Sequence, residues 1–193
     1  MLKKELILRN PLRQLGFENE DILSAGAFGA ILAHAGVGKT ALLVQLALNG
    51  MLRGKNVLHI SLHDPVKKVN LWYGELFHHL AGHDEGGQVS GLWESVLPHR
   101  LIMTFRVENF TVEKLKERLN DLTEQGIFAP EIMIIDGLNF DNSQRSALND
   151  LKALAAGNGM RVWFTHTTGK LVSKSPTLAG FEVAVQEDGL PDG

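Results

Sequence analysis

The fold of this 193-residue chain is indicated by residues 33–40, which read AHAGVGKT. A short apolar run, residues 28–33, leads into this stretch, and a pattern of helical period follows it over residues 39–53. Gly36 and Gly38 allow backbone N–H groups to converge on anionic oxygens, because a Cβ at either position would obstruct the approach. The stretch therefore predicts a phosphate-binding loop between a strand and a helix, with Ala33 where the usual pattern has glycine.

The residue types after the glycines suit a nucleotide with a divalent cation. A helix that opens at Lys39 directs its positive end into the same hollow. The Lys39 ammonium can reach β- and γ-phosphates, and the Thr40 hydroxyl can ligate Mg²⁺. The residues expected to hold ATP are His34, Ala35, Gly36, Val37, Gly38, Lys39, Thr40 and Ala41. The alternative is an ordinary strand-to-helix turn that contains Lys-Thr by chance, and the strand and helix on either side argue against it.

Short apolar runs alternate with segments of helical period along the rest of the chain. We expect strands at 56–62, 100–105, 131–136 and 160–165, a sixth strand near 181–185, and helices over 65–82, after Thr111 and after Ser143. Residues 82–99 are rich in glycine and are expected to be an irregular surface excursion. Strands that are apolar on both faces predict an α/β fold in three layers, with a mostly parallel central sheet and helices on both faces. We expect one domain over 1–193, with a core of about 26–186 and an N-terminal extension over 1–25.

An acidic residue ends the most apolar of these strands. Residues 132–136 read IMIID, so Asp136 lies at the carboxyl edge of a buried strand. Ligands bind at that edge of a parallel sheet. A carboxylate there can hold Mg²⁺ or one of its waters, and the metal ligands expected are Thr40 and Asp136. Taken alone, an aspartate at a strand end is more often a turn former, but the loop at residues 33–40 favours the metal-ligand interpretation of Asp136.

The loop at 36–40, the strand at 57–62 and the strand that ends at Asp136 resemble the ATPase core of the RecA family. The likeness is to the branches of DnaB-type replicative helicases, KaiC and RadA, and it spans about residues 28–167. The resemblance implies a P-loop NTPase fold that binds ATP and Mg²⁺, with the strand ending at Thr165 between those ending at Ala33 and Asp136. It also implies assembly into homo-oligomeric rings or filaments, with ATP at subunit boundaries.

The chain departs from the family where a water-activating glutamate is expected. His63 occupies that position, and Asp64 follows it. Either side chain could accept a proton from water, Glu75 is a weaker candidate, and the base could also be absent. The family often has a γ-phosphate sensor after the fifth strand, and His166 matches that position. Its alternative is a solvent-facing histidine at a strand end.

Three other features suggest weaker hypotheses. Residues 167–176 occupy the place of the family's second DNA-binding loop, although a solvated loop is the simpler interpretation. An arginine finger cannot be chosen among Arg145, Arg161 and Lys170. Among the histidines at 78, 79 and 83, only the pair 79/83 has the i,i+4 spacing of metal ligands, and no third ligand is evident. We expect these histidines to form a surface cluster rather than a metal site.

Composition limits the remaining classes of function. The chain has no cysteine, which excludes disulfides and thiolate metal sites, and its net charge of −3 does not indicate DNA binding. No signal peptide or bilayer-spanning run is evident, so we expect a cytoplasmic protein without a membrane partner and with an unknown client. The leading hypothesis is an ATPase. The alternatives are a regulator that binds nucleotide without hydrolysis and, less favoured because no arginine-rich lid is evident, a small-molecule kinase.

Overall fold

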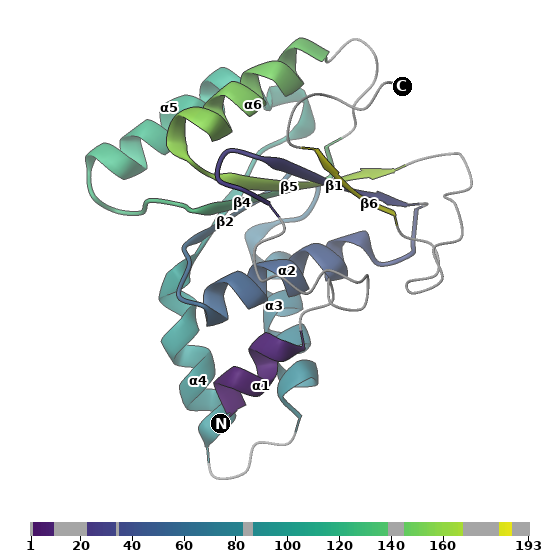
Figure 1. The fold of residues 1–193 in the computed structure, drawn as a ribbon, viewed down its shortest axis with the longest axis vertical. Coiled ribbons are helices and arrows are strands. Elements are labelled where there is room, and N and C mark those ends of the chain that lie inside the picture. The colour runs from purple at the N-terminus through teal and green to yellow at the C-terminus, as the bar shows by residue number, and fades with distance from the viewer. Residues whose placement is uncertain are drawn as a thin grey trace.

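The computed structural model describes residues 2–9, 23–33, 35–82, 87–138, 145–167 and 182–186. Within these residues the chain forms a six-stranded sheet with helices on both faces (Figure 1). The strands are β1 (Phe28–Ala33), β2 (Val57–Ser61), β3 (Arg100–Thr104), β4 (Ile132–Asp136), β5 (Arg161–Thr167) and β6 (Glu182–Gln186). The helices are α1 (Leu2–Leu8), α2 (Lys39–Leu52), α3 (Val66–Ala81), α4 (Gln88–Val96), α5 (Val112–Glu124) and α6 (Arg145–Asn158), with short 3₁₀ helices η2 (Leu97–His99) and η3 (Val107–Asn109). The α/β class and the helix–sheet–helix layering are confirmed.

The strand order is β3-β2-β4-β5-β1-β6. The first five strands pair in parallel, and β6 pairs antiparallel with β1. The expected place of β5 between β1 and β4 is confirmed. Because parallel strands end at the same edge, Ala33 of β1, Ser61 of β2 and Asp136 of β4 lie along one rim of the sheet, with Ser61 directly beside Asp136.

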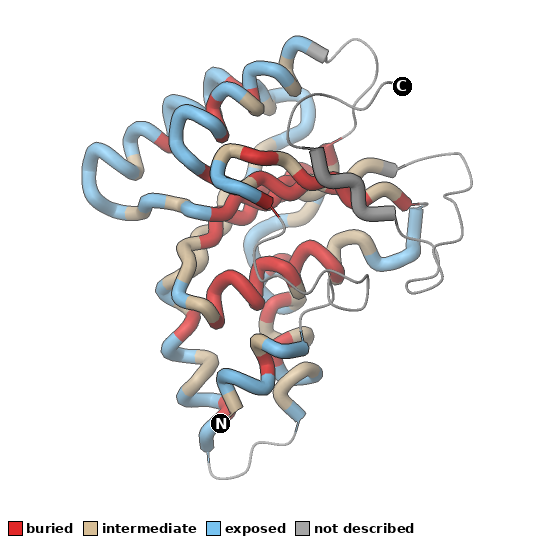
Figure 2. Tube along the Cα trace, viewed as in Figure 1, coloured by how far each residue is buried: buried red, intermediate tan, exposed pale blue. Residues whose placement is uncertain are grey.

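Each face of the sheet packs against its own layer of helices. On β4, Ile132 and Ile134 face the layer of α1, α2, α3 and α4, while Met133 and Ile135 face α5 and α6. The central strands are accordingly buried on both sides (Figure 2), which explains why their sequences are continuously apolar. Among the described residues, no helix combines the length and apolarity needed to cross a bilayer.

The first helix belongs to the core. Leu6 of α1 is buried, and the Asn49 side chain of α2 donates a hydrogen bond to the Ile7 carbonyl over 3.0 Å. The Arg9 guanidinium donates to the Leu80 carbonyl at the end of α3. Part of the expected N-terminal extension is therefore packed against α2 and α3.

The expectation of an irregular excursion over 82–99 is wrong for the described part of that segment. Helix α4 and the 3₁₀ turn η2 occupy residues 88–99, after Gly87, which has a left-handed backbone with φ of 75°. Val89 and Val96 of α4 are buried, and the Trp93 ring packs on Phe77 of α3. Tertiary burial of one face stabilises this short helix although Gly91 lies inside it, an effect that local propensity does not reveal.

Two predicted helix starts have different outcomes. Thr111 is the N-cap of α5, since its side chain accepts a hydrogen bond from the Lys114 amide over 3.2 Å, as expected. The predicted cap at Ser143 lies outside the described residues. The predicted sixth strand is confirmed as β6, one residue later than expected at each end.

Candidate functional site

The segment between β1 and α2 contains two glycines with a left-handed backbone. Gly36 and Gly38 have φ values of 79° and 92°, a left-handed conformation that residues with a side chain rarely adopt. A Cβ placed on Gly36 would meet no protein atom within 4 Å, so the space above that backbone is open. Gly38 caps α2 without a side-chain hydrogen bond, and the loop from Ala35 to Gly38 is exposed. The loop thus offers backbone N–H groups at a helix N-terminus to an anion.

Lys39 lies across the base of this loop. Its ammonium donates a hydrogen bond to the carbonyl of Ala33, at the end of β1, over 3.2 Å. Burial lowers the pKa of Lys39, and the charge of Asp136 acts in the opposite direction. The lysine of α2 and the carboxylate of β4 are therefore close enough to interact electrostatically.

The remaining loop residues are placed as follows. Thr40 and Ala41 are half-buried in the first turn of α2, and Val37 is exposed at the tip of the loop. His34, predicted to contact the nucleotide, lies outside the described residues. Thr40 is the second residue of α2, directly after Lys39.

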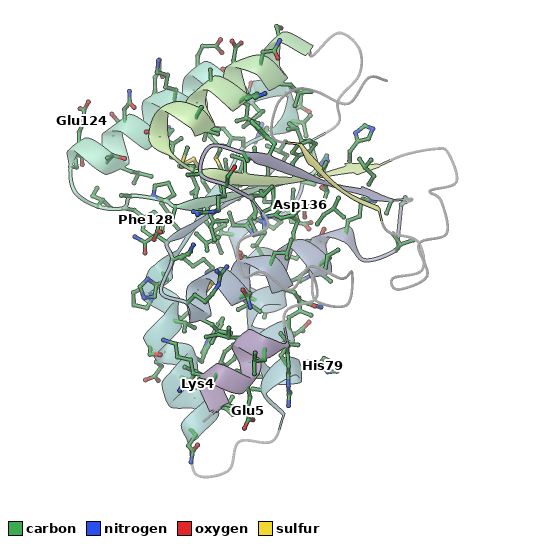
Figure 3. The ribbon with its side chains drawn as sticks, in the orientation of Figure 1. Lys4, Glu5, His79, Glu124, Phe128 and Asp136 are labelled. Carbon is green, nitrogen blue, oxygen red and sulfur yellow. The ribbon has the colours of Figure 1, made fainter. Side chains whose placement is uncertain are left out.

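Asp136 is tied to the neighbouring strand. Its Oδ1 accepts a hydrogen bond of 2.9 Å from Oγ1 of Thr165 on β5, and the Gly137 amide donates to that same Oγ1 over 3.1 Å. Thr165 is 2 % exposed. Figure 3 shows Asp136 at the sheet, between the two helical layers. Thr165 holds the carboxylate in one orientation, a role that the amino-acid sequence by itself did not indicate.

His63 is tethered to the residue that follows Asp136. Its Nε2 lies 3.1 Å from the carbonyl oxygen of Gly137. Gly137 has a φ of 91°, and a Cβ there would stand 2.2 Å from Cδ2 of the His63 ring. The ring therefore occupies space that only a glycine at 137 leaves open.

Asp64, the other candidate base, is turned toward α3. Its Oδ1 lies 2.7 Å from the ammonium of Lys68, one helical turn along the chain. Its amide donates to the Ser61 hydroxyl over 3.0 Å, and that hydroxyl donates to the Asp64 carbonyl over 2.9 Å. The Asp64 carboxylate is thus paired with a cation, Lys68, whereas the contact of His63 is with a backbone carbonyl. Glu75 is exposed on α3.

His166 follows Thr165 on β5 and is paired in register with Leu32 of β1. Side chains alternate along a strand, and Trp163 packs in the layer of α2 while Phe164 packs in the layer of α5 and α6. His166 therefore extends toward the face opposite Thr165. Its Nδ1 is buried and has no hydrogen-bond partner within the described part of the chain. Its role as a γ-phosphate sensor stays a prediction.

The residues present fit a magnesium ion that is bound largely through a nucleotide. No group of three or more His, Cys, Asp or Glu side chains that could hold a metal occurs among the described residues. Mg²⁺ in phosphate-transfer sites needs only one or two protein oxygens, with phosphate oxygens and waters completing its octahedron. Thr40 and Asp136 supply hard oxygen ligands of the right kind at one rim of the sheet.

The other sequence candidates do not join this rim. Arg161 begins β5 and donates from Nε to the Leu23 carbonyl over 2.8 Å, at the opposite end of the strand from the loop. The side chain of Arg145, Lys170 and the proposed DNA-binding loop beyond residue 167 lie outside the described residues. His78 and His79 are exposed on α3, and His83 is not described.

A buried polar cluster lies beneath the rim, on the α3 face of β2. His59 is fully buried, and its Nδ1 is 3.0 Å from the Tyr73 hydroxyl of α3. The Arg100 guanidinium lies over the Tyr73 ring, 4.4 Å from its centroid, and Nη2 donates to Oδ1 of Asn70 over 2.5 Å. Burial, reinforced by Arg100, lowers the pKa of His59 to about 3, with Asp64 opposing the shift. His59 is therefore neutral at physiological pH.

No protein-family model and no curated protein matches the chain.

Proposed function

We propose that the chain binds ATP with Mg²⁺ at the rim formed by the 35–40 loop and Asp136, and hydrolyses it to drive a change of conformation or assembly. The main observation behind the proposal is that a glycine loop, a lysine and a carboxylate lie close together at the carboxyl ends of parallel strands. A glycine loop opens a helix, a lysine stands at the base of the loop, and a carboxylate on β4 acts on that lysine. Together they match the charges of a triphosphate and its cation.

Each residue has a physical task in this proposal. The amides of the loop and the N-terminus of α2 bind phosphate oxygens, and Lys39 exchanges its bond to the Ala33 carbonyl for one to a phosphate. The cation neutralises charge that develops on the transferred phosphoryl group. Thr165 orients the Asp136 carboxylate toward that cation or one of its waters.

The proposal extends to the RecA-like P-loop NTPases, because the order β4-β5-β1 agrees with what that resemblance implied. On this basis the chain forms homo-oligomers whose assembly depends on the nucleotide. Light scattering of the purified protein with ATP, with ADP and without nucleotide tests this extension. A mass that stays monomeric in all three conditions argues against it.

A nucleotide-binding regulator without turnover is the second candidate. It is favoured by the contacts of Asp64, whose carboxylate is paired with Lys68, and by the absence of a glutamate at position 63. Stabilisation by ATP without phosphate release would select this candidate over the ATPase.

The binding proposal is tested by titrating ATP and Mg²⁺ into the protein in a calorimeter. We expect Lys39→Ala to weaken binding about tenfold or more, since it removes a charge-assisted bond. The matched control is Lys116→Ala on α5, which lies on the other face of the sheet and should leave the affinity unchanged. Equal affinity of the wild type and Lys39→Ala would overturn the proposal.

A further inference from the structure

One hydrogen bond between the His63 side chain and the main chain of Gly137 determines how the ring is held at the rim. The Nε2 atom of its ring lies 3.1 Å from the Gly137 carbonyl oxygen. A carbonyl oxygen can only accept a hydrogen bond, so Nε2 is the nitrogen that carries the proton in this contact. The lone pair of the neutral ring is consequently on Nδ1.

The backbone of Gly137 makes this contact possible. The left-handed φ of 91° turns the chain immediately after β4, and the ring of His63 lies where a Cβ on residue 137 would otherwise be. Gly137 is itself fixed, since its amide donates to the Thr165 hydroxyl that also binds Asp136. One hydrogen-bonded chain therefore links His63, Gly137, Thr165 and Asp136.

The neighbouring carboxylate is less suited to accept a proton. Asp64 is engaged by Lys68 and its backbone is folded onto Ser61, whereas the His63 side chain is exposed at the rim. Of the two adjacent candidates, it is the side chain of His63 that bonds to Gly137, the residue after Asp136.

We propose that the Gly137 carbonyl is a positioning group that holds His63 in the Nε2–H tautomer, so that Nδ1 accepts a proton from the water that attacks ATP. The inference rests on the proposed ATPase function. The water oxygen forms a bond to the γ-phosphorus, and the bond from that phosphorus to the bridging oxygen breaks with its electron pair going to ADP. The water proton passes to Nδ1 and is then released to solvent, which regenerates the neutral ring.

The tautomer is tested in the wild-type protein without any substitution at the rim. In the ¹⁵N-histidine-labelled chain, long-range proton–nitrogen spectra distinguish a protonated ring nitrogen from one with a lone pair. The His63 signals are identified by their loss in His63→Gln. We expect a protonated Nε2 and a lone pair on Nδ1, and the reverse tautomer would overturn the proposal whether or not ATP is hydrolysed.

Turnover variants test the role of His63. His63→Gln keeps an amide that can donate to the Gly137 carbonyl but has no basic atom, so kcat should fall about 100-fold or more while the KM for ATP stays within about threefold. His63→Glu should recover much of that loss, because a carboxylate can accept the proton. The control is His79→Gln, an exposed histidine of α3 that lies far from Asp136 (Figure 3) and should keep wild-type kcat.

The positioning role of Gly137 is tested by a double-mutant cycle. Gly137→Ala places a methyl group in the space of the His63 ring and should lower kcat about as much as His63→Gln does. In the double variant the two losses should not multiply, because both act through the same ring. Gly54→Ala controls for backbone strain, since Gly54 has a φ of 78° but open space around its Cβ position.

The outcomes separate this inference from the function on which it rests. Normal ATP binding and turnover in His63→Gln, or multiplying losses in the double variant, would overturn the inference and leave ATP hydrolysis standing. Loss of ATP binding in the wild type would overturn the proposed function. If Gly137→Ala does not fold, the tautomer and the comparison of His63→Gln with His63→Glu still decide the inference.

Discussion

The hydroxyl of Thr165 donates to Oδ1 of Asp136 over 2.9 Å, across the boundary between β5 and β4. The same hydroxyl accepts the Gly137 amide over 3.1 Å. One buried oxygen therefore orients the carboxylate and stabilises the turn that follows it. This small network connects the stability of the sheet edge to the geometry of the candidate site.

Thr165→Val should damage both properties at once. The change leaves the Gly137 amide without its acceptor and the carboxylate without its donor, which should cost about 1–3 kcal/mol of unfolding free energy. Denaturant unfolding measures the cost, and ATP titration should show weaker binding with Mg²⁺. Thr165→Ser keeps the hydroxyl and is the control. A Val variant as stable as the Ser variant would contradict the network.

Asp136→Asn should remove the effect of magnesium on nucleotide affinity. In the wild type we expect EDTA to weaken ATP binding, because in the proposed site a cation links the triphosphate to the carboxylate. The asparagine side chain is uncharged and attracts a cation only weakly, so the variant should bind ATP with nearly the same affinity with and without Mg²⁺. Calorimetric titrations under both conditions provide the measurement. A full magnesium effect in the variant would place the cation elsewhere.

Acid should destabilise the protein through His59. Its pKa is about 3 in the folded chain, because the ring is buried and Arg100 repels the proton, against about 6.5 in an unfolded chain. Between these values the unfolded state binds more protons, so stability falls as pH falls from about 6.5 to 3. The loss approaches about 4 to 5 kcal/mol at the lower limit.

His59→Gln tests this dependence, because the amide can still accept from Tyr73 but does not titrate. Unfolding free energies measured from pH 7 to pH 4 should decline less steeply for the variant than for the wild type. Parallel curves would show that other groups cause the acid sensitivity.

Two glycines with opposite surroundings should respond oppositely to alanine. A Cβ on Gly29 of β1 would stand 2.3 Å from the Trp163 ring, which is itself buried, so Gly29→Ala should cost about 1–3 kcal/mol or more. Gly74 lies inside α3 with no atom within 4 Å of its Cβ position, and Gly74→Ala should add about 0.5–1 kcal/mol. Thermal unfolding of both variants checks the pair. A destabilising Gly74→Ala would contradict the open surroundings.

One strand and one helix show which elements can be predicted from local sequence patterns and which cannot. Ile132 to Ile135 are apolar without interruption, which requires a strand covered on both faces, and the structure buries all four. The helix over residues 88–96 was missed for the complementary reason. The glycines before it and Gly91 within it are typical of a loop, and the packing of Val89, Val96 and Trp93 against other helices stabilises it.

Some residues of the candidate site were likewise predictable from the sequence, and others were not. Gly36, Gly38, Lys39 and Asp136 were identified from the sequence, because a loop between a strand and a helix and a carboxylate at a strand end are local features. Thr165 was missed because its importance depends on lateral register with β4, which the sequence does not encode at short range.

The sequence could not decide whether His63 or Asp64 is the better candidate for the general base, because the two are adjacent. The difference lies in their tertiary contacts: Asp64 pairs with the Lys68 side chain, and His63 bonds to the backbone of Gly137.

The amino-acid sequence alone determined the α/β class, the glycine loop between β1 and α2 and the position of the acidic strand end, because each follows from residues that are neighbours along the chain. Tertiary structure decided which side chains meet. The contacts of Asp136 with Thr165 and of His63 with Gly137 join segments 29 and 74 residues apart, and only the closing of the sheet brings such segments within hydrogen-bonding distance.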